Sequence, residues 1–253
     1  MDFVKKIIFA ITQFFSKKSV LNSDGMNILK NEISRWKLSP ERIMRIKGTA
    51  YYNGSHDILK RKRLAIGDSG RLQEIDNLPN NRIVDNQYAK LVNQKTNYLL
   101  GQPFVVSAEN KVYLENLKRI FNKRFMRTIK KAGRIMMNSG IAWLHPFYDR
   151  TGELNFKIFP GYEILPFWED DEKTKVSLAV RVYITEEYRG NGIKADVERA
   201  EVYAPTGVYR FILDGESLNY TEDSPYGAYV NVEGKEYNWD RIPLIPIKYH
   251  EGV

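Results

Sequence analysis

The stretch Pro79-Asn80-Asn81-Arg82-Ile83-Val84-Asp85, continued to Tyr98-Leu99-Leu100-Gly101-Gln102-Pro103-Phe104, carries signals for both ends of one helix. Asn80 or Asn81 can accept hydrogen bonds from the free N–H groups of a first turn, and Asp85 suits the positive end of the helix dipole. Gly101 favours the left-handed residue that follows a helix, and Pro103 cannot continue one. Apolar residues recur at helical spacing between these signals, which predicts one buried face, formed by Val84, Tyr88, Leu91, Val92, Tyr98 and Leu99.

Composition restricts the class of protein. The chain has 253 residues, of which 43% are hydrophobic and 13% aromatic, so it can bury the core of one large domain or two small ones and is not disordered. The absence of cysteine excludes disulfides, thiolate metal sites and a cysteine nucleophile, and it fits a reducing cytoplasmic origin. The net charge of +8 indicates either an anionic partner such as nucleic acid or an ordinary basic surface. No apolar run reaches the roughly 20 residues that span a bilayer.

Residues 2–18 form a predicted amphipathic helix with a basic polar side. Its apolar face includes Phe3, Ile7, Ile11 and Phe14. This face can dock on protein or lie on a membrane surface, and docking is the favoured interpretation because most such faces pack in a core. Gln13 interrupts the apolar segment and no small-residue cleavage site is evident, which argues against a signal peptide.

Further helices are predicted over residues 28–38, from Pro40 to near Gly48, over 110–122 and over 124–138. Two groups of cations lie in this part of the chain. The basic run Lys60, Arg61, Lys62 and Arg63 is either a solvated turn or a contact for phosphates or an acidic partner. The helix over 124–138 places a basic stripe opposite an apolar face, and this stripe is either its solvent side or a contact for nucleic acid or an acidic subunit surface. The stripe is Arg127, Lys130, Lys131 and Arg134, and the apolar face is Phe125, Ile129, Ala132 and Met136.

From Gly140 the period changes from helical to alternating. Residues 141–148 and 153–159 flank a turn and predict a hairpin, with Pro146 at an edge or bulge. Strands are also expected over 161–168, 176–184, 197–203, 208–213 and 217–221, and the strand over 176–184 shows the alternation of one buried face. The prolines of residues 242–247 restrict that segment to a sheet edge or extended strand. The sequence thus predicts an α+β fold, with N-terminal helices followed by a mixed, mainly antiparallel β-rich region, divided into a helical arm (1–48), a turn segment with helices (49–139) and the β-rich region (140–253).

Catalytic signatures are missing from the sequence. His56, His145 and His250 are far apart and lack metal-binding spacing, and there is no Gly-x-Ser-x-Gly elbow, dinucleotide fingerprint or P-loop. The acidic run over residues 169–172 lacks the calcium-loop pattern. We therefore expect a binding or assembly protein, with no enzyme activity, cofactor or metal.

Four stretches, in order, resemble the portal proteins of long-tailed bacteriophages. The first is Tyr51-Tyr52-Asn53-Gly54-Ser55-His56-Asp57-Ile58, similar to a "Y-Y-x-G-x-x-x-I" segment, and the second is the "I-V-D…Y-x-x-G-x-P" wording of residues 83–103. The third is Gly140-Ile141-Ala142-Trp143, similar to a "G-x-A-W" strand entry. The fourth joins residues 158–166 to 180–183. Together these stretches indicate resemblance over roughly residues 51–250.

The resemblance implies a structural subunit of a homo-oligomeric ring, typically of twelve copies, at one vertex of the phage head. Such a ring nucleates capsid assembly with capsid and scaffolding proteins, docks terminase, passes double-stranded DNA without sequence specificity and later holds a head-completion adaptor. The implied locations are the virion and, during assembly, the host cytoplasm. Family members continue into stem, tunnel-loop and crown segments, so the resemblance implies that this chain covers mostly the outer wing region. It also adds a third interpretation of the helix over 2–18, as an arm on a neighbouring subunit or the capsid.

Two other classes stay open. A peripheral membrane protein would use the basic amphipathic helix over residues 2–18. A sequence-independent nucleic-acid-binding protein would use the basic run at Lys60–Arg63 and the stripe from Arg127 to Arg134.

Overall fold

The computed structural model describes residues 23–67, 69–75, 77–149, 151–189, 192–215, 217–221, 226–232 and 234–250. The predicted helix over 2–18, with Phe3, Ile7, Ile11 and Phe14, lies outside these residues. Among the described residues, no helix is both long and apolar enough to cross a lipid bilayer.

The described chain is an α+β protein, as the sequence predicted, and the strand pairs recorded in it are antiparallel. The helices are α2 (Ser23–Lys37), α3 (Pro40–Tyr52), the short η1 (Asp57–Lys60), α4 (Gln87–Leu100), α5 (Lys111–Ile120) and α6 (Lys123–Ser139). The strands are β1 (Leu64–Ile66), β2 (Leu72–Glu74), β3 (Ile141–Tyr148), β4 (Leu154–Pro160), β5 (Ile164–Trp168), β6 (Val176–Arg189), β7 (Ile193–Ala204), β8 (Gly207–Asp214), β9 (Ser217–Tyr220), β10 (Tyr226–Gly227), β11 (Val230–Val232), β12 (Lys235–Tyr237) and β13 (Ile245–Lys248).

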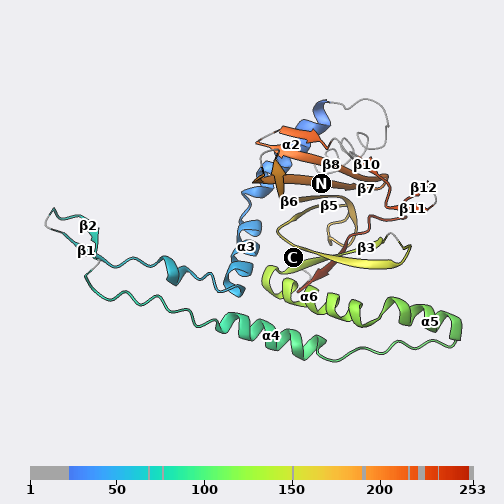
Figure 1. Ribbon diagram of the computed structural model, residues 1–253, viewed down its shortest axis with the longest axis horizontal. Coiled ribbons are helices and arrows are strands. Elements are labelled where there is room, and N and C mark those ends of the chain that lie inside the picture. Colours follow the sequence, from blue (N-terminus) through green and yellow to red (C-terminus); the bar gives the residue numbers. More distant parts are fainter. Residues whose placement is uncertain are drawn as a thin grey trace.

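The body is a stack of layers around a larger sheet (Figure 1). This sheet has the strand order β10-β8-β7-β6-β5, with β9 paired to β8. Helix α2 packs Leu29, Ile33 and Trp36 against one face of it. A smaller sheet, β13-β3-β4, packs on the other face through Trp143 and Phe159. Helix α6 packs on β3 and β4 and, on its other side, on α3 and α4.

Strand β6 contributes to both cores, which corrects the prediction of one buried face. Leu178, Val180 and Val182 pack towards α2, whereas Ala179 belongs to the core beneath the smaller sheet. The alternation fails at the far end, where Ile184 is 65% exposed. The sequence could not show this because small residues such as Ala179 suit either a buried or an exposed position.

The β3–β4 hairpin is confirmed. Its strands pair from Ala142↔Pro160 to Tyr148↔Leu154, and Gly152 in the turn has a φ of 79°. Strand β13 is an edge strand and pairs with β3 only over residues 141–144. Beyond Leu144, β3 therefore has one neighbour, which is why Pro146 fits without interrupting a second ladder.

The prediction that the helix of the organising stretch starts at Asn80 or Asn81 is wrong. Helix α4 starts at Gln87, and its N-cap is Asn86, whose Oδ1 accepts from Ala89 N at 3.0 Å. The Asn86 Nδ2 also donates to Tyr52 O at 3.0 Å, which ties the start of α4 to the last turn of α3. Residues 79–86 are non-helical, so Val84 does not belong to the helix.

Other helix predictions need correction. Gly101 has a right-handed conformation, with a φ of −77°. Of the expected apolar face of α4, Val92 is buried, but Leu91, Tyr98 and Leu99 are exposed. Helix α3 continues past Gly48 to Tyr52, and the helix predicted over 110–122 is the shorter α5, which buries none of its residues.

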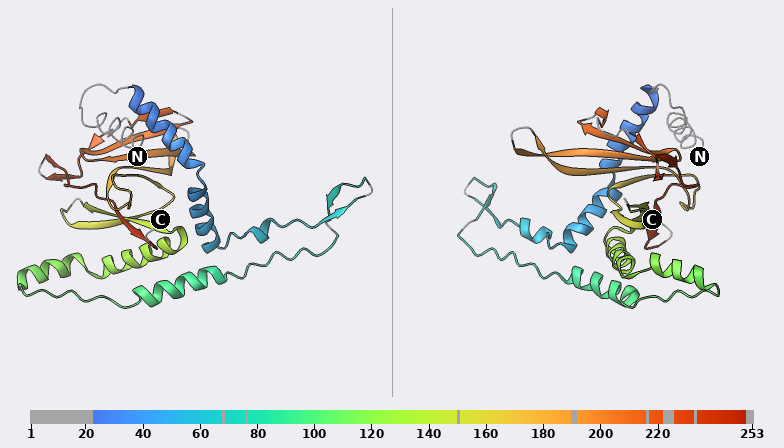
Figure 2. Two further views of the ribbon diagram at one scale, coloured as in Figure 1. Left: turned by 180° about the vertical axis from the view of Figure 1, so that it is seen from behind. Right: turned by 45° about the vertical axis from the view of Figure 1, so that its right-hand side comes forward.

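Between α3 and α4 the chain leaves the body as a long arm with the β1–β2 hairpin at its tip (Figures 1 and 2). We call residues 53–86 the hairpin arm. The Asn53-Gly54 turn predicted from the sequence opens it, with Gly54 at a φ of 85°. The arm lies at one end of the molecule and the start of α5 at the other.

Candidate nucleic-acid interface

Helix α6 carries the basic stripe, and its ends are fixed by local chemistry. Asn122 is the N-cap, and its Oδ1 accepts from Arg124 N at 2.8 Å and Phe125 N at 3.1 Å. Gly140 follows the helix in the left-handed conformation, with a φ of 74°. The predicted helix over 124–138 is confirmed to within one residue at each end.

Packing fixes the rotation of α6 about its axis. Phe125 is buried among Phe104, Phe121 and Phe156, with ring centroids 4.8–6.1 Å away. Gly133 lies against α4, where an added Cβ would come within 2.6 Å of Leu100 Cδ1. With this side held inward, the predicted stripe points outward: Arg127 and Lys131 are exposed and Lys130 and Arg134 are half-buried. Of the predicted apolar face, Phe125 and Ala132 are buried and Ile129 and Met136 are half-buried.

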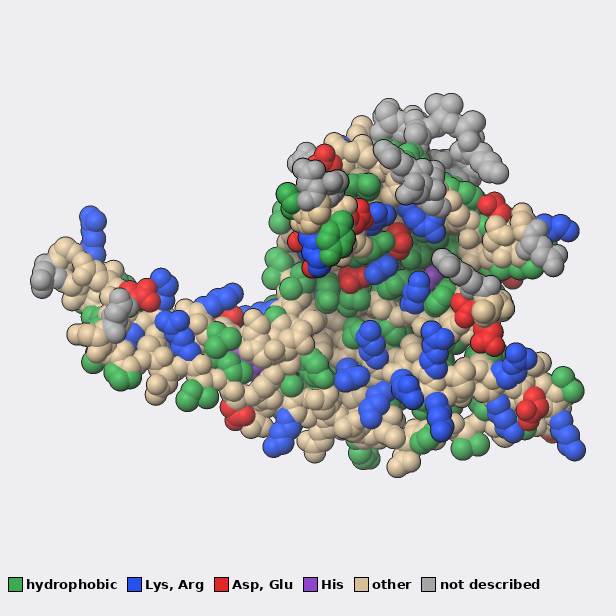
Figure 3. Space-filling model, viewed as in Figure 1, with side chains coloured by type: hydrophobic (Ala, Val, Ile, Leu, Met, Phe, Trp, Pro, Cys, Tyr) green, Lys and Arg blue, Asp and Glu red, His purple; other side chains and the backbone are tan. Residues whose placement is uncertain are grey.

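The charge of α6 is entirely of one sign. Its cations are Lys123, Arg124, Arg127, Lys130, Lys131 and Arg134, and it contains no Asp or Glu. No ion pair is recorded for these cations within the described chain. The pairs Lys123–Arg127, Arg127–Lys131 and Lys130–Arg134 place like charges four residues apart, which destabilises a helix. Figure 3 shows Lys and Arg side chains gathered over this lower part of the molecule.

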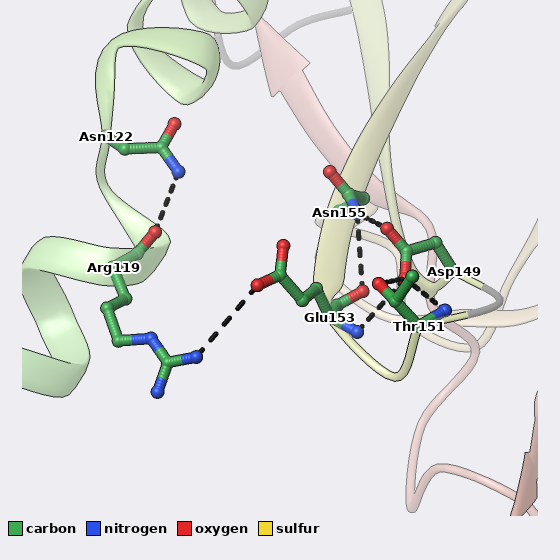
Figure 4. A network of polar contacts seen from close by, with 6 residues as sticks. All are labelled: Arg119, Asn122, Asp149, Thr151, Glu153 and Asn155. Atoms are coloured by element: carbon green, nitrogen blue, oxygen red, sulfur yellow. Dashed lines mark hydrogen bonds and ion pairs between the residues drawn. The ribbon is translucent and has the colours of Figure 1, made fainter.

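A network of polar contacts runs from the α5–α6 junction to the β3–β4 turn (Figure 4). Asn122 Nδ2 donates to Arg119 O at 2.7 Å, and the Arg119 guanidinium lies 3.9 Å from Glu153 Oε1. Within the turn, Asp149 Oδ1 accepts from Thr151 Oγ1 at 2.6 Å and from Glu153 N at 3.1 Å. These bonds, that from the Thr151 side chain above all, lower the pKa of Asp149 and keep the turn ordered beside the basic helix.

A cleft between α6 and β4 extends the stripe. It has a volume of about 460 Å³, and Thr128, Lys131, Lys157 and Arg181 are among the residues that line it. Lys157 is exposed on β4, and its Nζ lies 4.5 Å from the centre of the Phe147 ring. Lys157 was not among the cations expected from the sequence, because a lone cation within a strand does not show which helix that strand lies beside.

Arg181 is neutralised inside the protein and is not a free cation of the cleft. Its Nε lies 2.9 Å from Glu163 Oε2 and its Nη1 3.4 Å from Glu201 Oε2. Its guanidinium lies between two rings, 4.0 Å from the centre of Phe159 and 3.9 Å from that of Tyr183. Arg181 therefore joins the two sheets, while Lys131 and Lys157 supply the positive charge.

The second predicted cation group is not brought to α6. Lys60, Arg61, Lys62 and Arg63 are exposed on the hairpin arm, away from the body. Lys62 Nζ pairs with Glu74 Oε2 at 2.8 Å, and Arg63 Nη1 donates to Pro79 O at 2.6 Å. The two groups thus form separate surfaces.

The buried tyrosines and histidine around Arg181 serve packing. Tyr203 OH donates to Glu201 Oε2 at 2.9 Å, and burial raises the pKa of Tyr183 to about 12. His145 Nδ1 lies 2.7 Å from Pro243 O, and the ring stacks on Phe159. Within the described residues, no three His, Asp or Glu side chains are grouped so that they could hold a metal ion.

The chain was compared with known proteins. The model of the family "Phage portal protein, SPP1 Gp6-like" matches residues 32–251. This chain belongs to the phage portal protein family. The resemblance found in the sequence is thereby confirmed, and the basic helix and the hairpin arm are features of a portal-family subunit.

Two curated portal proteins are similar to it. The portal protein of Bacillus phage SPP1 is 31% identical over 219 residues, which cover 85% of this chain and 42% of the relative. The portal protein of Clostridium phage phiCD119 is 26% identical over 149 residues, which cover 55% of this chain and 32% of the relative. This portal-family chain thus spans less than half the length of these relatives.

Replacement of Arg181 should destabilise the folded protein, because Arg181 serves the fold and is not part of the cation surface. The variant Arg181→Met leaves Glu163 and Glu201 without their buried counter-ion, so we expect the free energy of unfolding to fall by about 3 kcal/mol in urea titrations. The matched control, Lys131→Met in the same cleft, should change it by less than about 0.5 kcal/mol. Equal effects of the two variants would contradict the structural role of Arg181.

His145 should make stability depend on pH below neutrality. Burial lowers the pKa of His145 below its ordinary value of 6.5, Lys157 and Arg181 act in the same direction, and the Pro243 carbonyl and Glu201 oppose it. As the pH falls below 6.5, the unfolded chain therefore binds a proton at His145 before the folded chain does. The contribution of neutral His145 to the free energy of unfolding is complete above pH 6.5 and is lost as the pH falls below it.

The test compares urea unfolding at pH 7 and pH 5. In His145→Asn the amide can still donate to Pro243 O but does not titrate, so the loss of stability between the two pH values should be smaller than in the parent chain. The same loss in both proteins would show that another group causes the pH dependence.

Proposed function

We propose that this chain is a structural subunit of the ring through which double-stranded DNA is packaged into the phage head and ejected from it. The observation that carries this proposal is the match to the portal family over residues 32–251. In the proposed ring, typically of twelve copies, the subunit contacts capsid and scaffolding proteins, terminase and a head-completion adaptor. It acts in the virion after assembly in the host cytoplasm, and it catalyses no reaction.

The basic stripe of α6 is the surface that we assign to DNA. Its like charges destabilise the isolated helix, so they are better explained by a polyanion that relieves the repulsion than by folding. The cleft beside Lys131 adds one cation from a second element, Lys157 of β4, which extends the stripe from the helix onto the neighbouring strand. Side chains that meet phosphates without reading bases give the sequence-independent, salt-sensitive contact that passage of DNA requires.

A ring with a central hole is the first expected observation. Negative-stain images of the protein made from its full gene should show such rings. The apolar face Phe3, Ile7, Ile11 and Phe14 is proposed as a subunit-docking face, so replacing all four residues by Ser should lower the yield of rings because the face then has no apolar area to bury. Particles without a hole would contradict the proposed function, whereas an unchanged yield from the Ser variant would contradict only the docking face.

DNA binding by the α6 stripe should be weak and steeply dependent on salt. In Arg127→Gln with Lys131→Gln, two phosphate contacts are removed, so the slope of log affinity against log salt should become shallower by about 2. The matched control, Lys111→Gln with Lys118→Gln on α5, removes the same charge from another exposed helix and should leave most of the slope in place. Fluorescence anisotropy with duplexes of unrelated sequence measures the slope for both double variants. An equal change in the two slopes would show that net charge, and not the α6 stripe, causes the effect.

A further inference from the structure

The hairpin at the tip of the arm has one apolar face. The register pairs Leu64 with Glu74, Ala65 with Gln73 and Ile66 with Leu72. Because directly opposed residues and residues two apart share a face, Leu64, Ile66, Leu72 and Glu74 lie on one side and Ala65 and Gln73 on the other. Glu74 lies at the base of this side and pairs with Lys62, so the three aliphatic residues form its apolar part. The three aliphatic side chains are 51%, 75% and 68% exposed, respectively. We call them the hairpin face.

Nothing in the described chain covers this face. No other helix or strand packs extensively against β1 or β2. A hairpin of three residue pairs is not stable in water by itself and needs a surface on which to bury its apolar side. The view in Figure 2 places it well beyond the body, so it cannot reach the rest of its own described chain.

A second uncovered apolar patch lies at the other end of the molecule. Val112 and Tyr113, in the first turn of α5, are 73% and 57% exposed, and Val105 in the preceding segment is also exposed. Helix α5 buries none of its residues. Figures 1 and 2 both place this turn at the opposite end from the hairpin.

We propose that the hairpin arm docks on a second copy of this chain, with the hairpin face packed against the first turn of α5 in the neighbour. The inference rests on the proposed ring. A closed ring with one subunit type needs a head-to-tail interface between two different patches. The hairpin face and the first turn of α5 are two different uncovered apolar patches at opposite ends of the described chain, which suits that geometry. DNA fits the hairpin face poorly, because its aliphatic side chains offer phosphates no hydrogen bond, and Glu74 beside them is an anion paired with Lys62.

Thiol cross-linking tests the pairing directly, because the chain has no cysteine of its own. Chains with Ile66→Cys are mixed with chains with Val112→Cys and treated with a short bis-maleimide. We expect a cross-linked dimer that contains one chain of each kind, several-fold more abundant than in a mixture of Ala65→Cys with Val112→Cys, since Ala65 faces away. Dimers formed mainly by Ile66→Cys alone would show arm-to-arm packing and overturn the proposal.

A charge pair tests the apolar character of the face without unfolding the hairpin. Ile66→Glu with Leu72→Lys places opposite charges at one cross-strand pair and leaves the net charge unchanged. Ala65→Glu with Gln73→Lys makes the same change on the other face and is the matched control. Light scattering of the full-gene protein should show several-fold less assembly for the first variant and little change for the second.

The outcomes separate this inference from the proposed function. Rings that form equally well with both charge pairs, or without the mixed cross-link, overturn the docking of the arm and leave the ring in place. A protein that stays monomeric in every variant and in the parent overturns both.

Discussion

Burial of strand β6 on both faces is the constraint on which the rest of this fold depends. Leu178, Val180 and Val182 hold α2 on one side, and Ala179 lies where the smaller sheet packs on the other. Because the small side chain of Ala179 leaves room, Trp143 of β3 can approach the larger sheet and stays fully buried. The position of the smaller sheet then sets that of α6, which packs on β3 and β4.

The packing of these layers explains why the basic stripe of α6 faces solvent, but it does not explain why the stripe is positively charged. Packing of Phe125 and Gly133 decides which side of α6 faces solvent, and any polar side chains could occupy that side. A folding requirement alone would favour alternating signs at four-residue spacing, since such pairs stabilise a helix. Folding therefore does not require the uniform positive sign, and this sign fits the polyanionic partner that we propose for α6. Arg181, with Glu163 and Glu201 beside it, shows how the same protein treats a cation that serves the fold.

The sequence predicted elements well where one local signal dominated. The apolar and basic periodicity of residues 124–138 predicted α6, and the turn before Glu153 predicted the β3–β4 hairpin. Predictions from the sequence were wrong where a tertiary contact, and not a local signal, decides where an element begins. The sequence predicted a cap at Asn80 or Asn81, whereas the helix is capped by Asn86, which also donates to Tyr52 O of the preceding helix. The stripe on α6 was predicted, but Lys157 was not, because the proximity of β4 to α6 is a result of the layer order.

The errors in predicted burial share a physical cause. Periodicity reports that a helix or strand has an apolar side, but it cannot report whether that side is covered by the same chain. Leu91 and Leu99 of α4, Tyr113 of α5 and the hairpin face all have this pattern and are exposed in one copy. Contiguous exposed apolar surface is unusual in a protein that acts alone and marks interaction sites. In a subunit of the proposed ring, the apolar side of a helix or strand can be buried against a neighbouring chain. A prediction of burial from sequence can then be right about the side chain and wrong about the molecule that covers it.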